Sequence, residues 1–185
     1  MIDQIDLFAA AGAAEAAAGN FDVEAIPTSG SIPIPPGIYS DLDTLTRHCN
    51  DCQRCGLAAG RTNVVVSRGN PQAPIMIVGE GPGQQEDEQG LPFVGKSGQL
   101  LEKILAAVRL DTEQDVYICN VVKCRPPNNR TPVADETAAC KGYLLEQIRL
   151  VDPKIILLTG ATAMKGLTGE KRGITKIRGQ WIEWE

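Results

Sequence analysis

Residues 75–79, Ile75-Met-Ile-Val-Gly79, decide the fold because they form a short apolar run that ends in glycine. Such a run is typical of a strand that is buried on both faces. Downstream, apolar runs alternate with segments of helical spacing. Further strands are predicted at 116–122, 154–159 and 181–184, and helices at 98–110, 131–151 and 161–167. Strands that alternate with helices predict a parallel sheet covered by helices on both faces.

The predicted fold is therefore a three-layer α/β/α domain around a central, mostly parallel four-stranded sheet. The last predicted strand has barely begun where the sequence stops at Glu185, so we expect the fourth strand and a final helix to be truncated. We expect an incomplete folded domain at 41–185. Residues 1–40 are rich in Ala, Pro and Gly without a clear period, which predicts a flexible tail and linker. In parallel sheets the working site lies at the carboxyl ends of the strands.

The composition, 43% hydrophobic and 22% charged, is that of a globular protein. The sequence contains no apolar run of about 18 residues, which predicts no membrane span. It also has no basic segment before an apolar stretch at its start, which predicts no secretory signal. We therefore expect a cytoplasmic protein, in which thiols stay reduced. Six cysteines in such a protein indicate metal or cofactor ligation before disulfides.

The formal net charge of −5 is unevenly distributed. Residues 1–45 hold seven acids and no Lys or Arg, whereas the rest of the chain holds 16 acids and all 18 basic residues. The segment 161–178 has five basic residues against one acid. A body with local basic stretches can bind DNA phosphates even when an acidic tail sets the total charge.

Four cysteines have a spacing that can close a tetrahedral thiolate site: Cys52, Cys55, Cys124 and Cys140. The spacing alone does not separate zinc from a [4Fe–4S] cluster, because both accept four thiolates. Buried structural cysteines are the alternative. Cys119 falls inside a predicted strand, which favours a core position. Cys49 extends the motif to C-x-x-C-x-x-C, but we expect it to be a core residue as well.

Two glycine-containing loops follow the first strand. Gly79-Glu-Gly-Pro-Gly-Gln-Gln-Glu-Asp87 allows close backbone approach to a ligand and carries carboxylates that can hold a water molecule. Gly90–Ser97 matches the P-loop pattern G-x-x-x-x-G-K-[ST] letter for letter. We interpret this match as accidental, because no strand directly precedes Gly90 and Pro92 removes an N–H that would bind phosphate.

Together these segments resemble the family 4 uracil-DNA glycosylases, which are iron–sulfur enzymes of the uracil-DNA glycosylase superfamily. The resemblance runs from about residue 52 to residue 160. It rests on CxxCGL with Arg61, GEGPGQQED, GLPFVGKSGQLL, VYICNVVKCRPPNNRTP and Glu136-x-x-x-Cys140. It implies a hydrolase that flips uracil out of DNA and cleaves its N-glycosidic bond, which starts base excision repair. It also implies a [4Fe–4S] cluster on Cys52, Cys55, Cys124 and Cys140.

The resemblance further assigns five residues to the active site. Glu80 and Gly81 match the first active-site motif, and Glu86 matches a carboxylate important for activity. Phe93 matches the aromatic residue that stacks on the extruded uracil, and Asn120 matches the asparagine that reads the base edge. An Asn amide offers both a donor and an acceptor, which suits O4 and N3–H of uracil. Other families of the superfamily have a carboxylate at the position of Gly81, so Glu80 or Glu86 is expected to orient the water here.

The sequence departs from the family in one respect. The family carries a His-Pro-Ser or similar motif after the fourth strand, whereas the single histidine here is His48. We expect a C-terminal truncation rather than a degenerate homologue, because every upstream motif is intact. The alternatives are a catalytically incomplete iron–sulfur or zinc DNA-binding homologue, a P-loop NTPase and a purely structural protein.

The N-terminal segment Gln4-Ile-Asp-Leu-Phe8 resembles the short peptide by which bacterial repair proteins dock on the sliding clamp. Such peptides insert apolar anchors, here Leu7 and Phe8, while Gln4 would form a hydrogen bond nearby. A flexible tether keeps a linked enzyme at high local concentration on DNA. The expected partners are therefore uracil-containing DNA and the bacterial sliding clamp. We expect no membrane partner and a monomeric protein.

Overall fold

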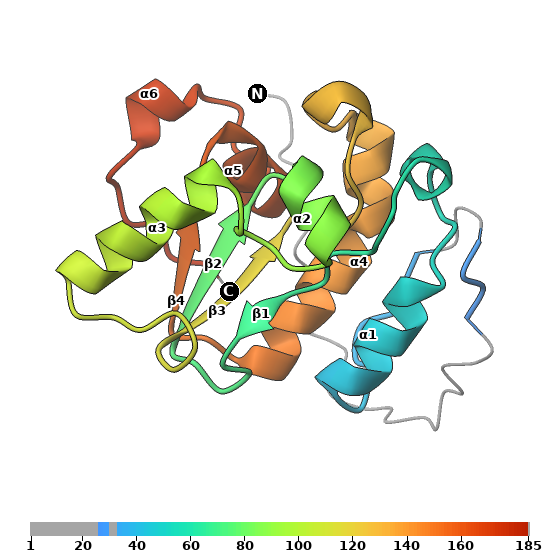
Figure 1. Ribbon diagram of the computed structural model, residues 1–185, viewed down its shortest axis with the longest axis horizontal. Helices are drawn as coiled ribbons and strands as arrows, with labels where there is room; N and C mark the ends of the chain where they lie inside the picture. Colours follow the sequence, from blue (N-terminus) through green and yellow to red (C-terminus); the bar gives the residue numbers. More distant parts are fainter. Residues whose placement is uncertain (1–25, 30–32, 185) are drawn as a thin grey trace, which may run out of the picture.

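A computed structural model describes residues 26–29 and 33–184 of the chain. These residues form a four-stranded sheet in the order β1-β3-β2-β4 (Figure 1). The strands are β1 (Arg68–Gly69), β2 (Ile75–Gly79), β3 (Val116–Asn120) and β4 (Ile155–Leu158). β2 runs parallel to both of its neighbours, β3 and β4, and β1 is antiparallel to β3. The predicted mostly parallel four-stranded sheet is confirmed.

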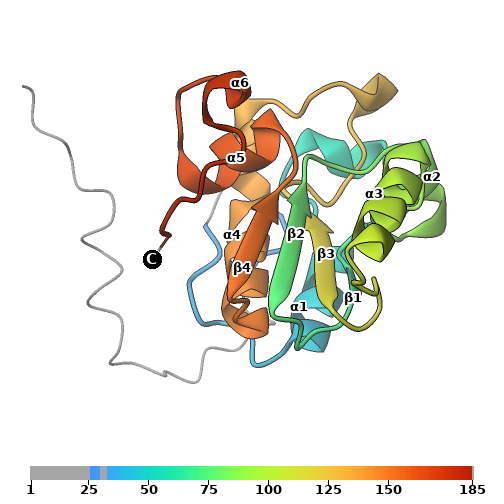
Figure 2. The same cartoon turned by 90° about the vertical axis from the view of Figure 1, so that its left-hand side faces the viewer.

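Helices cover both faces of this sheet. They are α1 (Leu42–Asn50), α2 (Gln84–Gln89), α3 (Lys96–Ala107), α4 (Ala134–Val151), α5 (Ala161–Thr168) and α6 (Ile174–Ile177), with short 3₁₀ helices η2 (Gly56–Ala59) and η3 (Pro127–Asn129). α3 lies on one face, and α1 and α4 lie on the other (Figures 1 and 2). Met76 and Val78 enter the core beneath α4, whereas Ile77 packs with Leu101 and Leu105 of α3. Since side chains alternate along a strand, the continuous apolar run of β2 requires both layers.

The helices begin where a side chain satisfies otherwise unpaired N–H groups. α1 begins after Asp41, whose Oδ1 accepts a hydrogen bond of 2.7 Å from the Thr44 N–H. α4 begins after Val133, whose N–H donates to Glu136 Oε2 at 2.9 Å, rather than at Thr131. These carboxylates serve as local acceptors for N–H groups that have no partner inside the helix.

One predicted strand is wrong. Residues 181–184 are irregular and Trp181 is 83% exposed, whereas the fourth strand of the sheet is β1. The alternation of this segment suits a strand, but a strand also needs a ladder partner, and β4 pairs only with β2 among the described residues. β1 was missed because its two residues carry no apolar pattern. Arg68 pairs with Ile118 of β3, so these residues form a strand only because the folded chain brings them next to β3.

The packed part of the chain begins upstream of residue 41, the predicted domain boundary. Ile34 and Tyr39 are buried, and Glu146 of α4 accepts hydrogen bonds from the N–H groups of Gly37 at 2.8 Å and Tyr39 at 3.3 Å. The proposed clamp peptide at Gln4, Leu7 and Phe8 lies outside the described residues. None of the helices within 26–29 and 33–184 combines the length and apolar character that a membrane crossing requires.

The segment that matches the P-loop pattern connects two helices. Gly90 ends α2 in the left-handed conformation, with φ of 73°, and Gly95 precedes the first residue of α3. The nearest upstream strand, β2, ends at Gly79. A P-loop joins a buried strand directly to a helix. The structure therefore supports the interpretation that the match is accidental.

Candidate active site

A cavity of about 480 Å³ opens at the carboxyl ends of β2 and β3. The loop after β2, the start of α3, the end of β3 and the loop that follows it contribute most of the lining. All five residues predicted for the active site line this cavity: Glu80, Gly81, Glu86, Phe93 and Asn120. Its position agrees with the rule that ligands bind beyond the carboxyl ends of parallel strands.

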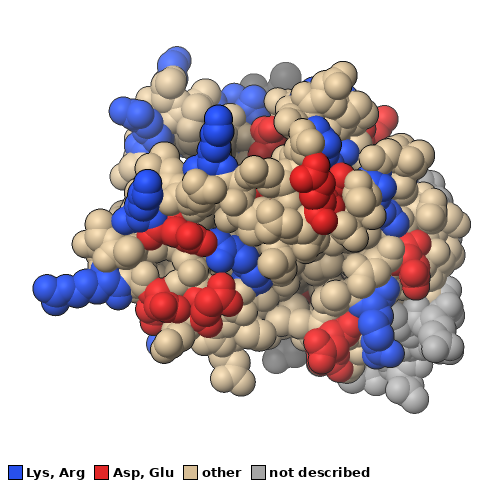
Figure 3. Space-filling view, viewed as in Figure 1, with Lys and Arg blue, Asp and Glu red and all other residues tan. Residues whose placement is uncertain are grey.

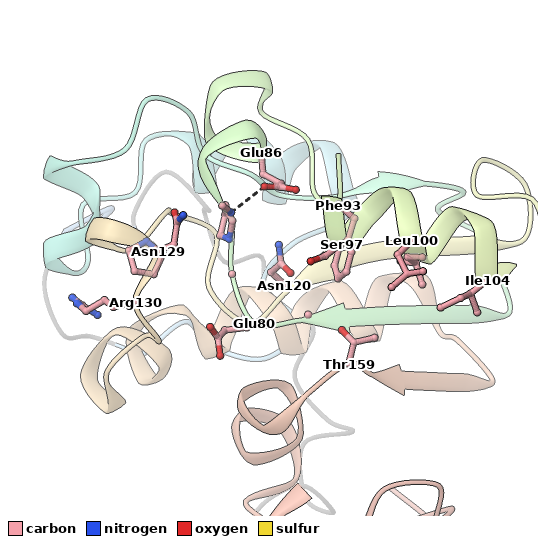
Figure 4. Close-up of a pocket in the computed structure, with 16 residues that line it drawn as sticks. Glu80, Glu86, Phe93, Ser97, Leu100, Ile104, Asn120, Asn129, Arg130 and Thr159 are labelled. Atoms are coloured by element: carbon pink, nitrogen blue, oxygen red, sulfur yellow. Dashed lines mark hydrogen bonds between the residues drawn. The ribbon is translucent and has the colours of Figure 1, made fainter. Parts of the chain in front are cut away.

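Phe93 and Asn120 meet above Gly79, the last residue of β2 (Figure 4). A β-carbon placed on Gly79 would lie 2.6 Å from Cζ of Phe93 and would also collide with Oδ1 of Asn120. Gly79 is paired with Asn120 in the parallel ladder, which sets the Asn120 side chain beside it. The absence of a side chain at Gly79 therefore lets the ring of Phe93 and the buried amide of Asn120 both pack against the end of β2.

Glu86 fastens the two loops of the cavity to each other. Its Oε2 accepts a hydrogen bond of 3.1 Å from the Gly83 N–H, in the loop after β2. Its Oε1 accepts hydrogen bonds from the N–H groups of Val94 at 3.1 Å and Gly95 at 2.8 Å, in the loop before α3. Both carboxylate oxygens are thus occupied by backbone donors. These contacts hold the turn that carries Phe93 against the glycine-rich loop.

Phe93 itself has a left-handed backbone, with φ of 57°. This conformation is uncommon for a residue with a bulky side chain and persists only where neighbouring contacts enforce it. Arg68 of β1 provides such contacts, since its guanidinium donates to the carbonyl of Pro92 at 2.8 Å and of Phe93 at 3.1 Å. Gly98 lets α3 approach, because any β-carbon there would collide with the Phe93 backbone.

Glu80 has a different environment from Glu86. One oxygen of its carboxylate accepts a short hydrogen bond from the hydroxyl of Thr162 in α5. No other hydrogen bond to this carboxylate occurs within the described part of the chain. Gly81, the next residue, packs closely on Val122, since a β-carbon there would lie 2.7 Å from Cγ2 of Val122. A carboxylate at position 81 would therefore require Val122 to move.

The four cysteines predicted as ligands line a second, small cavity. Cys52 and Cys55 lie between α1 and η2, Cys124 follows β3, and Cys140 lies in α4. Cys49 also borders this cavity and is buried, whereas Cys119 points into the core from β3. Within the residues that the structure describes, no three His, Cys, Asp or Glu side chains converge on a single metal-ion position.

Arg61 links two of the cysteine segments. Its guanidinium donates to the Cys52 carbonyl at 2.6 Å and to Cys124 Sγ at 3.4 Å. Burial raises the pKa of the Cys140 thiol to about 12, and it also raises the pKa of Cys124, where the hydrogen bond from Arg61 opposes the rise. The deprotonated thiols that metal ligation requires would therefore need a neighbouring positive charge.

Comparison with known proteins assigns the chain to a family. The model of the uracil-DNA glycosylase superfamily matches residues 66–184. The chain is 49% identical over 144 residues to a type-4 uracil-DNA glycosylase of Thermotoga maritima, which covers 77% of this chain and 74% of the relative. The chain belongs to the type-4 uracil-DNA glycosylase family. It is also 45% identical over 149 residues to the type-4 enzyme of Sulfurisphaera tokodaii, covering 78% of this chain and 67% of the relative.

Among the residues that the family resemblance singles out, the structure brings the five pocket residues together in one cavity and the four cysteines in another. Three neighbours of the pocket were not predicted from the sequence. Arg68 lies in a segment without a recognisable motif, so the sequence did not indicate that it supports the pocket. Thr162 falls in the helix predicted at 161–167, but nothing in the sequence indicated that it contacts Glu80. Gly79 was recognised as a strand end, but its closeness to both Phe93 and Asn120 depends on the strand register.

Proposed function

We propose that this type-4 uracil-DNA glycosylase is a DNA repair hydrolase that flips uracil out of DNA and cleaves its N-glycosidic bond. The main support for the proposal is the cavity that Phe93 and Asn120 line together, side by side against Gly79. A glycosylase must hold its base outside the helix in a fitted pocket, at a cost of a few kcal/mol for unstacking. The phenyl face of Phe93 would recover part of that stacking energy.

Asn120 would select uracil. Its side chain is buried, with the residue 2% exposed, and its amide makes no hydrogen bond to another described side chain or backbone group. The amide is not among the fully buried polar atoms of the described residues that lack a partner, and it lines the cavity, so its donor and acceptor are available to a ligand. The NH₂ group suits O4 of uracil and the carbonyl suits N3–H, whereas the exocyclic amine of cytosine would meet a second donor.

Glu80 is the better candidate for orienting the attacking water. The two oxygens of Glu86 already accept three backbone N–H groups, so this carboxylate positions the loops. Glu80 lines the same cavity and has one oxygen engaged by Thr162. A carboxylate that keeps an acceptor site free can align a water molecule and favour the positive charge that develops on the sugar.

These two assignments predict different phenotypes. Glu80→Gln should lower the rate of uracil release while leaving the unfolding midpoint within about 2 °C of the parent, because no backbone donor loses its acceptor. Glu86→Gln should lower the free energy of unfolding by about 1–3 kcal/mol, because an amide NH₂ cannot accept from the loop N–H groups. Thermal unfolding and single-turnover uracil release measure both. Equal loss of stability in the two variants would contradict the distinction.

The cysteine cavity fits a [4Fe–4S] cluster on Cys52, Cys55, Cys124 and Cys140. Among the described residues, thiols are the only metal-binding side chains around it, those of Cys49 and of the four proposed ligands, and four thiolates are the donor set of iron–sulfur sites. A cluster bound there would have a structural role, because its cysteine ligands would link the segment around Cys52 to α4.

Iron analysis tests the cofactor. Purified protein should be brown, absorb broadly near 400 nm and contain roughly four irons per chain, as thiolate-ligated clusters do. Zinc without iron after anaerobic purification would contradict the cluster assignment and leave the pocket assignment untouched.

The DNA partner suits the charge distribution. On the side of the molecule where α6 lies, Lys and Arg side chains project from the surface (Figure 3), and residues 161–178 carry five basic residues against one acid. Such groups bind phosphates without reading sequence. Reduced thiols in the cysteine site suit a cytoplasmic location, and all six cysteines are free in the structure. Clamp binding through Gln4, Leu7 and Phe8, and a monomeric state, stay predictions.

Release of free uracil tests the function directly. The protein should liberate uracil from an oligonucleotide that contains one uracil, and leave the same oligonucleotide with cytosine unchanged, without added metal. Asn120→Ala should abolish most of this release, whereas Asn70→Ala, which removes an exposed amide bonded to the Gln114 carbonyl, should not. An Asn120→Ala variant as active as the parent would contradict the pocket assignment.

A further inference from the structure

Lys123 is a buried lysine without a carboxylate partner. The residue is 1% exposed, and none of the five ion pairs among the described residues includes it. Its ammonium donates a hydrogen bond of 2.6 Å to the backbone carbonyl of Asn120. Lysine is almost never fully buried unless it is paired, because removing an ammonium from water costs several kcal/mol. A partner charge must therefore be sought among its other neighbours.

The neighbours of Lys123 are thiols. The residue borders the same small cavity as the four proposed ligand cysteines. Its positive charge opposes the increase that burial causes in the pKa of Cys49, Cys119 and Cys140. Once the cavity holds thiolates, their negative charge is the compensation that the buried ammonium otherwise lacks. Lys123 thus lies between the cysteine cavity and the residue that ends β3.

We propose that Lys123 couples the two sites: its ammonium balances the negative charge of the four-thiolate centre, and its N–H holds the Asn120 carbonyl, so that a loaded cysteine site keeps the base-reading amide in place. The proposal rests on the proposed function of both cavities. Lys123 is a positioning residue in this scheme, because it lines the cysteine cavity and reaches the base only through Asn120.

The chain between the two sites is short enough to transmit the effect. β3 ends at Asn120, and Cys124 follows after three residues. The turn is anchored by backbone hydrogen bonds from Val121 N–H to the Gly79 carbonyl at 2.9 Å and from Val65 N–H to the Lys123 carbonyl at 2.8 Å. These contacts restrain the backbone, while Lys123 supplies the charge-assisted bond to the Asn120 carbonyl. Loss of the thiolate charge would leave a buried ammonium uncompensated, a cost that favours movement of Lys123 toward water and away from the Asn120 carbonyl.

Two variants separate charge from hydrogen bonding. Lys123→Met keeps the length of the side chain and removes both, whereas Lys123→Gln keeps a neutral donor. Each is purified with its iron–sulfur content measured, and Cys119→Ala serves as a control that changes a buried neighbour outside the cysteine cavity. Two properties are then measured: the reduction potential of the cluster, and the affinity for an oligonucleotide carrying a non-hydrolysable 2′-fluoro uracil nucleotide relative to the matching 2′-fluoro cytosine nucleotide.

Both lysine variants should shift the potential to more negative values, because a nearby positive charge favours the reduced cluster. Lys123→Met should lose about tenfold in the preference for uracil over cytosine, the loss of one charge-assisted hydrogen bond, and Lys123→Gln should lose less. An unchanged potential in both variants, or an unchanged uracil preference in Lys123→Met, would overturn the coupling. A parent protein that binds no uracil analogue, or holds no cluster, would instead reveal failure of the proposed function or cofactor.

Discussion

The base pocket and the cysteine cavity are built in opposite ways. The pocket is formed mainly by one stretch, residues 79–97, and its shape depends on glycines and backbone N–H groups. The cysteine cavity is formed by side chains that come from residues 49–61, 123–124 and 139–143. The first site therefore depends on the conformation of two loops. The second depends on holding distant segments together, as a structural cofactor does.

The largest expected effect distinguishes these two kinds of site. Cys140→Ala should remove the absorbance near 400 nm and lower the free energy of unfolding by about 4 kcal/mol or more, because loss of a metal centre is among the few changes of that size. Iron content and thermal unfolding measure it. Cys119→Ala, also buried, should keep its iron. Full iron occupancy in Cys140→Ala would show that α4 does not contribute a ligand.

The next effect concerns the pocket. Gly79→Ala places a β-carbon against Phe93 and Asn120, so both side chains must move from their positions in the pocket. We expect uracil release to fall about 10²-fold, as a displacement of about 1 Å at an active site can cause. Gly60→Ala, where a β-carbon meets nothing within 4 Å, should be neutral. Single-turnover rates measure both variants. A fully active Gly79→Ala enzyme would place the base elsewhere.

Phe93→Ala should have a smaller effect, a loss of about 1–3 kcal/mol in base binding if stacking on single-stranded bases is the right scale. Its iron content should not change, since the ring does not border the cysteine cavity. Phe93→Tyr retains the aromatic face and should bind the base nearly as well as the parent. Affinity for the uncleavable uracil oligonucleotide measures the difference. Equal binding by Phe93→Ala would rule out stacking.

The sequence predicted the parts that depend on contiguous patterns. The apolar run at 75–79 and the helical spacing after residue 98 located β2 and α3, and the family motifs named residues that share the pocket. The two-residue strand β1 was missed, because pairing with β3 rather than its own composition makes it a strand. The same limit applies to Arg68 and Lys123, since a single basic residue in a sequence does not show whether it is exposed or buried.

The smallest expected effect concerns the surface ion pairs of Arg68, the residue that supports the Phe93 turn. Glu102→Gln removes one ion pair of Arg68, at 3.0 Å, but Glu113 still contacts the guanidinium at 3.2 Å. Since Glu102 is half exposed, we expect a change in stability below about 0.5 kcal/mol and no change in uracil release. Arg68→Met, by contrast, frees the carbonyls of Pro92 and Phe93 and should slow release. Thermal unfolding and release assays compare the two variants.

The three backbone contacts of Glu86 have a consequence for protein engineering. A designer who transplants the base pocket into another α/β scaffold cannot move the glycine-rich loop and the Phe93 turn as separate grafts, since one carboxylate fixes both. A graft would need residues 79–98, and the recipient must also supply an arginine that holds the Phe93 turn, as Arg68 does, and an adjacent parallel strand that ends in an amide side chain, as Asn120 does here. Loop grafts that omit Glu86 would keep the rest of the sequence motif but lose the hydrogen bonds that hold the two loops in this conformation.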